Sequence, residues 1–127
     1  MFSSEKEKIM TLTEKMKERL ETTEALSGKN SERYLLQSQL LYAADFLENS
    51  DVHETLILKK ECKGEVITVE FKPSDFLFGQ KDVKKIYYDK EMTTVRKVKR
   101  IPIPKTIENA VTHCIYDLII NGYQIVK

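Results

Sequence analysis

The spacing of hydrophobic residues first changes along the chain at Asn49, Ser50 and Asp51. Before this point apolar residues recur at the period of an α-helix, after it they alternate with polar residues at the period of a β-strand, and near the C-terminus the helical period returns. The two periods predict an α+β fold: two N-terminal helices, an antiparallel sheet of two hairpins, an amphipathic C-terminal helix and a short final strand. The 127 residues are enough for a single domain, residues 1–127, whose core needs neither disulfides nor a metal.

The first helix is expected to be an outer element. Ser4 and Glu7 have the spacing of a capping box at its start, and Gly28 is expected to end it. Its apolar residues form a stripe too narrow to bury much surface. Residues 1–27 are therefore interpreted as an outer helix or as an oligomerising helix that pairs with another copy of the chain. The stripe consists of Ile9, Leu12, Met16, Leu20 and Leu26.

The second helix differs from the first because its apolar residues surround it almost completely. Asn30 or Ser31 can cap it, and the apolar positions run over residues 34–47. A helix that is apolar on nearly all sides must be buried on more than one side. We therefore expect it at the centre of the molecule, within a core formed by residues 30–127.

Alternating segments predict two β-hairpins. The first is expected to turn at residues 61–64, where Gly64 allows the unusual backbone angles of a turn. Residues 74–79, after the first hairpin, are interpreted as an irregular segment too apolar to remain in water. The four predicted strands are residues 55–60, 65–72, 83–88 and 92–101.

The C-terminal part predicts one regular amphipathic helix and a strand. Pro104 and Thr106 suit a helix start, and Asn121 and Gly122 suit its end. Residues 123–126 are expected to return to the sheet edge as a short strand. The apolar stripe of the helix is Ile107, Ala110, Val111, Cys114, Ile115, Leu118 and Ile119.

Positive charge is concentrated in the second hairpin. The chain has a net charge of +1, but residues 83–105 carry 8 basic and 2 acidic side chains. A face of this kind is a candidate binding site for an anion. The alternative interpretation is that the lysines keep an exposed edge strand soluble and unpaired.

The predicted ligand site combines this hairpin with the C-terminal helix. Basic side chains bind phosphate groups, and tyrosine rings stack on bases. On the helix, His113 and Asp117 are spaced i, i+4 and are expected to share the outer face with Tyr116 and Ile120. The predicted ligand-binding residues are Lys85, Tyr87, Arg96, Lys97, Lys99, Arg100, Asn109 and His113.

Several classes of protein are excluded by what the sequence lacks. Cys62, Cys114, His53 and His113 are the full set of cysteines and histidines, and they form neither a zinc motif nor a disulfide framework. No glycine-rich phosphate or dinucleotide motif occurs, so no cofactor and no metal are expected. Without a long apolar run, a secretory signal or a basic recognition helix, we expect a cytoplasmic protein that binds neither membranes nor duplex DNA.

The leading functional hypothesis is a small non-enzymatic binding protein, a homo-oligomer, that holds or sequesters a nucleotide-like anion on the cationic hairpin. The alternative is a protein-interaction module or inhibitor that binds an acidic protein surface. A composition rich in Lys, Glu and Ile without Trp is typical of small proteins of low-GC bacteria and their phages or mobile elements, among which such inhibitors are common. A hydrolase or transferase that uses His113 and Asp117, and a single-strand nucleic-acid binder, complete the set of hypotheses.

Overall fold

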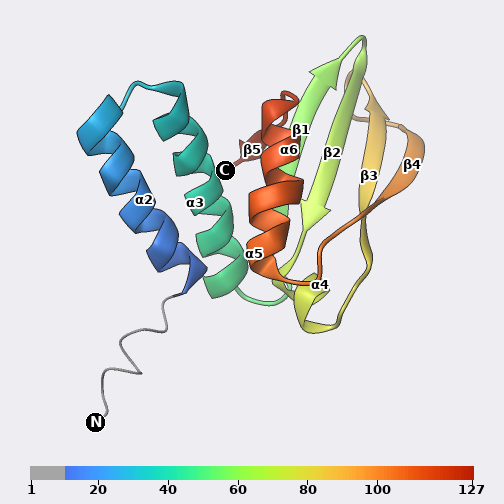
Figure 1. Cartoon of the computed structure of the whole chain (residues 1–127). Coiled ribbons are helices and arrows are strands. Elements are labelled where there is room, and N and C mark those ends of the chain that lie inside the picture. Colours follow the sequence, from blue (N-terminus) through green and yellow to red (C-terminus); the bar gives the residue numbers. More distant parts are fainter. Residues whose placement is uncertain (1–10) are drawn as a thin grey trace.

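The computed structural model describes residues 11–127, in which helices cover an antiparallel sheet (Figure 1). The strands lie in the order β4-β3-β2-β1-β5, and every neighbouring pair is antiparallel. The predicted α+β fold with two hairpins and a final strand is confirmed. The elements are α2 (Leu12–Ser27), α3 (Glu32–Asn49), β1 (Leu56–Cys62), β2 (Glu65–Phe71), α4 (Pro73–Leu77), β3 (Asp82–Asp89), β4 (Val95–Pro102), α5 (Ile107–Asn109), the π-helix η1 (Ala110–Ile115), α6 (Tyr116–Ile120) and β5 (Gln124–Val126).

Helix α2 begins at Leu12, so the prediction of one continuous helix from Ser4 is wrong. Thr11 has extended backbone angles and forms a capping box with Glu14, in which the Glu14 N–H donates to Thr11 Oγ1 at 3.2 Å. The Thr11–Glu14 pair has the same spacing as the Ser4–Glu7 pair, and the sequence alone did not rank the two. The proposed Ser4–Glu7 box lies outside the described residues.

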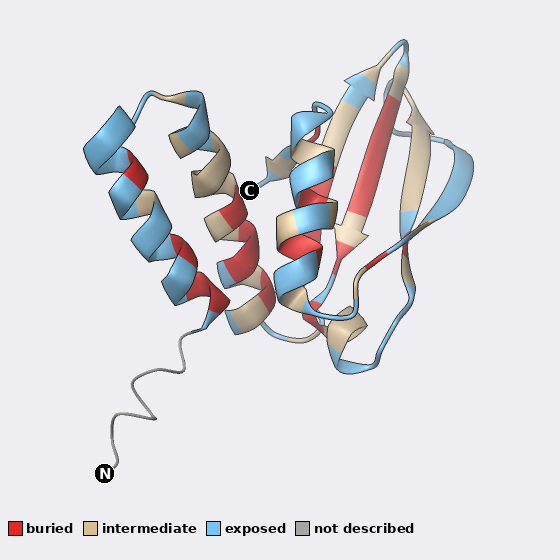
Figure 2. Cartoon of the chain, viewed as in Figure 1, coloured by how far each residue is buried: buried red, intermediate tan, exposed pale blue. Residues whose placement is uncertain are grey.

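Helix α3 is buried on two sides, as predicted. It begins after the N-cap Ser31, and it lies between α2 and the C-terminal helical segment α5–η1–α6 (Figure 2). Ala43 and Ala44 are fully buried, and their small side chains allow the neighbouring helices to approach closely. Near its end, Glu48 accepts hydrogen bonds from the backbone N–H groups of Leu12 and Thr13, which fastens the start of α2 to α3.

The turn of the first hairpin is tighter than residues 61–64. Strand β1 continues to Cys62, which pairs with Glu65, so the loop contains only Lys63 and Gly64. Both have positive φ, 49° and 81°, as a two-residue type I′ turn requires. Cys62 is therefore a half-buried strand residue rather than a turn residue.

The segment after β2 also differs from its prediction. Residues 73–77 form the short helix α4, with proline in its first turn. Phe76 packs on the core, but Leu77 and Phe78 are 66% and 69% exposed. The prediction that the whole segment is irregular and buried is wrong, because one helical turn can direct only part of its side chains toward the core.

The C-terminal helix is not regular. Its middle, Ala110–Ile115, is a π-helix, in which the Tyr116 N–H donates to the Val111 carbonyl five residues earlier. The wider turn leaves Val111 and Ile115 fully buried but changes the direction of the residues that follow. Tyr116 consequently faces α2 and α3, and the predicted shared face of Tyr116 with His113 and Asp117 is wrong.

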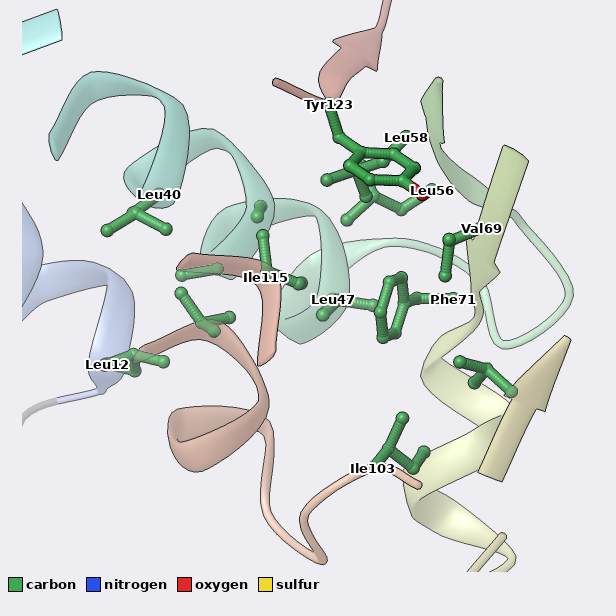
Figure 3. Close-up of a cluster of buried hydrophobic side chains, with 14 of the residues drawn as sticks. Leu12, Leu40, Leu47, Leu56, Leu58, Val69, Phe71, Ile103, Ile115 and Tyr123 are labelled. Atoms are coloured by element: carbon green, nitrogen blue, oxygen red, sulfur yellow. The ribbon is translucent and has the colours of Figure 1, made fainter. Parts of the chain in front are cut away.

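One face of the sheet carries the core. Side chains alternate across a strand, so Leu56 and Leu58 of β1 share a face with Val69 and Phe71 of β2, and all four are almost completely buried (Figure 3). Leu47 of α3 and residues of the C-terminal helix pack against them. The same face continues onto β3 and β4, where β4 is exposed along nearly its whole length (Figure 2).

Candidate functional site

The uncovered part of this face is built around Tyr87. In the β3–β4 ladder Lys85 lies opposite Lys99, and Tyr87 lies opposite Lys97, so all four side chains share the core-bearing face. The Nζ atom of Lys97 lies 4.5 Å from the centre of the Tyr87 ring, that of Lys85 5.6 Å and that of Lys99 6.0 Å. These are cation–π distances, so three ammonium groups surround one aromatic ring.

Two residues outside the hairpin complete this group. Lys60 of β1 and Tyr123, just before β5, join it because the Nζ atoms of Lys60 and Lys85 lie 5.7 Å and 5.8 Å from the centre of the Tyr123 ring. Lys85 therefore bridges two tyrosines. We call this group the lysine–tyrosine cluster; its members are Lys60, Lys85, Lys97, Lys99, Tyr87 and Tyr123.

Sequence reasoning missed Lys60 and Tyr123. One signal for Lys60 was present, because Leu56, Leu58 and Lys60 alternate along one strand and must share a face. Its distance from the second hairpin is set by the ladder, in which Lys60 pairs with Ile67 and Ile67 pairs with Tyr87. The position of Tyr123 depends on how the chain passes from the end of the C-terminal helix to strand β5.

The cluster is strongly positive. Among residues 11–127 the ion pairs are Lys29–Glu24 and Arg100–Asp82, so none of the cluster lysines has a carboxylate partner in this part of the chain. Burial disfavours the charged form of Lys85, but interactions with the Tyr123 and Tyr87 hydroxyls outweigh it and raise the pKa of Lys85 above its usual 10.5. Lys85 is therefore fully charged at neutral pH.

Asp89 is the acidic residue of β3 closest in sequence to Tyr87, and its carboxylate is hydrogen-bonded within the hairpin turn. Asp89 lies two positions beyond Tyr87, and its carboxylate accepts hydrogen bonds from the backbone N–H groups of Thr93 at 2.6 Å and Thr94 at 3.2 Å. The Thr93 hydroxyl also donates to it, and these bonds lower the pKa of Asp89 below its usual 3.8. The negative charge of Asp89 thus stabilises the turn between β3 and β4.

The two arginines proposed as ligand-binding residues lie outside the cluster. Arg100 pairs with Lys84 on the opposite face of the sheet, where its guanidinium donates to Asp82 at 2.9 Å. Arg96 occupies the irregular step of the ladder next to Tyr87 and Tyr88, and its charge helps to lower the pKa of Asp89. The cluster therefore contains four of the six hairpin residues predicted from the sequence.

His113 lines a separate hollow between the C-terminal helix and the end of β4. This cavity of about 320 Å³ is lined by residues of the C-terminal helix and by the end of β4. Ile101 connects it to the cluster, because Ile101 lies two residues after Lys99 on the same side of β4. The lining residues are Ile101, Pro102, Pro104, His113, Cys114, Asp117 and Leu118.

This hollow brings together three titratable side chains, His113, Cys114 and Asp117. His113 and Asp117 both line it, but no hydrogen bond or ion pair joins them in the described residues. Burial, and then the Asp117 charge, raise the pKa of the Cys114 thiol above its usual 9.0, so the thiol is protonated at neutral pH. Asn109 belongs to the helix start, where its backbone N–H donates to Thr106 Oγ1 at 3.1 Å, and it does not line this hollow.

Larger hollows lie between the helices. One of about 670 Å³ is lined by residues of α2 and α3, and one of about 480 Å³ is bounded by α2, α3 and the C-terminal helix. Neither is lined by a residue of the lysine–tyrosine cluster. The concentration of charge and these two hollows are thus in different parts of the molecule.

Two further observations complete the description of residues 11–127. No three His, Cys, Asp or Glu side chains in this range gather closely enough to hold a metal ion. No helix in it has the length and apolar content that crossing a bilayer requires. Comparisons of the chain with protein-family models, with curated proteins and with solved structures give no match.

Proposed function

We propose that this protein is a non-enzymatic binding protein that holds a small, nucleotide-like anion on the lysine–tyrosine cluster. The observation that supports it is the arrangement of four lysines around two tyrosine rings, without a carboxylate partner among the described residues. Lysines held this close repel one another, and a bound anion relieves that repulsion. Its phosphate oxygens would accept charge-assisted hydrogen bonds from the ammonium groups.

The aromatic members favour a ligand that has more than a phosphate group. Tyr87 is half-buried, so part of its ring is accessible to a base or another flat group. Lys97 and Lys99 are exposed and flexible, and can move from the ring to a phosphate. Lys60, Lys85 and Tyr123 are more buried and would form the fixed floor of the site.

We favour binding over catalysis because the acid–base candidates are in a different place from the charge. His113 and Asp117 line their own hollow and are not hydrogen-bonded to each other. In this proposal the protein acts in the cytoplasm and as a homo-oligomer.

The proposal is tested by isothermal titration calorimetry with ATP at low salt, using a matched pair of variants. Lys60 points to the cluster, and its neighbour Lys59 points to the opposite face of the same strand. Both Lys60→Ala and Lys59→Ala remove one positive charge. We expect Lys60→Ala to weaken ATP binding by about ten-fold, the loss of one charge-assisted hydrogen bond, and Lys59→Ala to leave it nearly unchanged.

Two outcomes would contradict the proposal. Equal effects of the two variants would mean that ATP senses only the net charge of the protein. Absence of binding by ATP, adenosine diphosphate and tripolyphosphate, together with native mass spectra that show no retained ligand, would remove the small-anion function altogether.

A further inference from the structure

Strand β4 is an open edge of the sheet. It is the last strand in the order β4-β3-β2-β1-β5, and seven of its eight residues are exposed. No segment of residues 11–127 pairs with its outer side, and Figure 2 shows it exposed along its length. The opposite edge is β5, which has only three residues. An edge of this length presents a row of backbone groups to which another strand can bond.

The ladder identifies which backbone groups point outward. The Ile103 N–H donates to the Lys81 carbonyl at 3.0 Å, so these two residues form a hydrogen-bonded pair. Hydrogen-bonded pairs recur at every second position of an antiparallel ladder, and Lys99 therefore turns its backbone groups inward to β3. Val98 and Arg100 occupy the alternate positions, and their N–H and C=O groups face outward.

The side chains along this edge are cationic on both faces of the sheet. Lys97 and Lys99 project to the core-bearing face, Arg100 projects to the opposite face, and Arg96 lies at the irregular step between Tyr87 and Tyr88. No acidic residue lies between Val95 and Pro102. A strand added to this edge would have its own side chains alternating to both faces, next to these basic residues.

We propose that the β4 edge binds an acidic, extended segment of a partner protein by strand addition. Backbone hydrogen bonds to Val98 and Arg100 would supply binding energy, and carboxylates opposite the lysines would supply selectivity. This inference does not rest on small-anion binding, although both use Lys97 and Lys99.

The same charges disfavour pairing of the edge with a copy of itself. Two β4 edges side by side would bring basic residues together, and like charges across a strand pair are destabilising. Protection from self-association and selection of an acidic partner therefore follow from one feature. A second copy of this chain is an unsuitable occupant, while an acidic strand neutralises the edge.

The decisive variant removes an outward N–H and leaves the fold's own ladder intact. Val98→Pro deletes a backbone donor that makes no bond to β3. Pro102 already occupies an outward-facing position of the same strand, and edge positions of this kind tolerate proline. The control is Val98→Ala, which shortens the side chain and keeps the N–H group.

The probe is a fluorescein-labelled, eight-residue peptide of alternating glutamate and valine, titrated with the full chain and followed by fluorescence anisotropy. We expect Val98→Pro to weaken peptide binding by about ten-fold or more, and Val98→Ala to leave it unchanged. Two further peptides test the proposal with the unmodified protein, so their results do not depend on whether Val98→Pro folds. One is methylated on alternate backbone nitrogens along its bonding edge, and the other has glutamine in place of glutamate; both are expected to lose binding.

The results separate this proposal from the anion site. Lys60→Ala should reduce ATP binding but not peptide binding, and Val98→Pro should do the reverse. Equal binding of the parent and methylated peptides would overturn strand addition, because only charge would then be recognised. Tighter binding of an oligothymidylate than of the peptide, without any response to Val98→Pro, would assign the edge to single-stranded nucleic acid and also overturn the proposal.

Discussion

The two halves of the sheet use the same face in opposite ways. On β1 and β2 this face carries Leu58, Val69 and Phe71, which are completely buried beneath the helices. On β3 and β4 the same face contributes Val83 to the core, but farther along it carries Tyr87, Lys97 and other members of the lysine–tyrosine cluster. Both halves have an alternating pattern, so alternation specifies a face but not what covers it. Coverage by the helices makes one half a core and leaves most of the other half exposed to solvent.

The largest expected effect comes from opening a cavity in the covered half. Phe71 is fully buried at the centre of the core (Figure 3). We expect Phe71→Ala to lower the free energy of unfolding by about 3–5 kcal/mol, measured by urea denaturation, because the helices and sheet cannot collapse to fill the space. A loss below about 1 kcal/mol, the range of surface substitutions, would contradict the assignment of this face as the core.

A pair of valines contrasts the buried face of β2 with the opposite, exposed face of β4. Val69 on β2 is 0% exposed, and Val98 on β4 is 51% exposed. We expect Val69→Ala to cost about 2–3 kcal/mol of unfolding free energy and Val98→Ala less than about 0.5 kcal/mol, in the same denaturation assay. Similar costs for the two variants would mean that β4 is covered in solution, by an oligomeric partner for example.

Within the helical layer, Glu48 of α3 caps the start of α2. Its carboxylate accepts the backbone N–H groups of Leu12 and Thr13, which have no partner inside their own helix. Glu48→Ala should therefore lower the unfolding free energy by about 1–2 kcal/mol, as the loss of a helix cap does. Glu21→Ala, an exposed change on α2, is the control and should have little effect. Equal values for Glu48→Ala and Glu21→Ala would refute the capping role.

The smallest expected effect is a pH dependence of the turn between β3 and β4, in the uncovered half of the sheet. Hydrogen bonds from Thr93 and Thr94 lower the pKa of Asp89 from its usual 3.8. In the window just below pH 3.8 the unfolded chain therefore binds more protons than the folded one. The contribution of Asp89 is present above pH 3.8 and is lost as the pH falls through the lowered pKa.

The amide chemical shifts of Thr93 and Thr94 should report this titration in an NMR experiment. We expect a midpoint below 3.8, and no transition in Asp89→Asn. A midpoint at or above 3.8 in the unmodified chain would show that the turn does not hold the carboxylate.

Much of the architecture could be predicted because its signals are local. The change of period at residues 49–51 separated the helices from the sheet, and Gly64 marked the first turn. The errors have physical reasons of two kinds. The Ser4–Glu7 and Thr11–Glu14 pairs have the same capping-box spacing in the sequence, and a π-helical turn leaves no trace in a 3.6-residue pattern.

Part of the candidate site could also be predicted from local signals, and part could not. Lys85, Tyr87, Lys97 and Lys99 could be grouped from the sequence because they belong to one hairpin, whose alternation and register are set by its own residues. Lys60 and Tyr123 could not, since their distances depend on contacts between strands far apart in the chain. Arg100 was grouped with them by proximity in sequence, yet a strand places adjacent residues on opposite faces.

By itself, the sequence determined the α+β class, the two hairpins and the concentration of positive charge in one of them, because periodicity and composition act over a few residues. Only the tertiary structure decided which half of the sheet the helices cover. It also decided that Lys60 and Tyr123 complete the cluster, and that Val98 and Arg100 turn their backbone groups outward. These features depend on strand order and register, which are settled by the packing of the whole chain around one core.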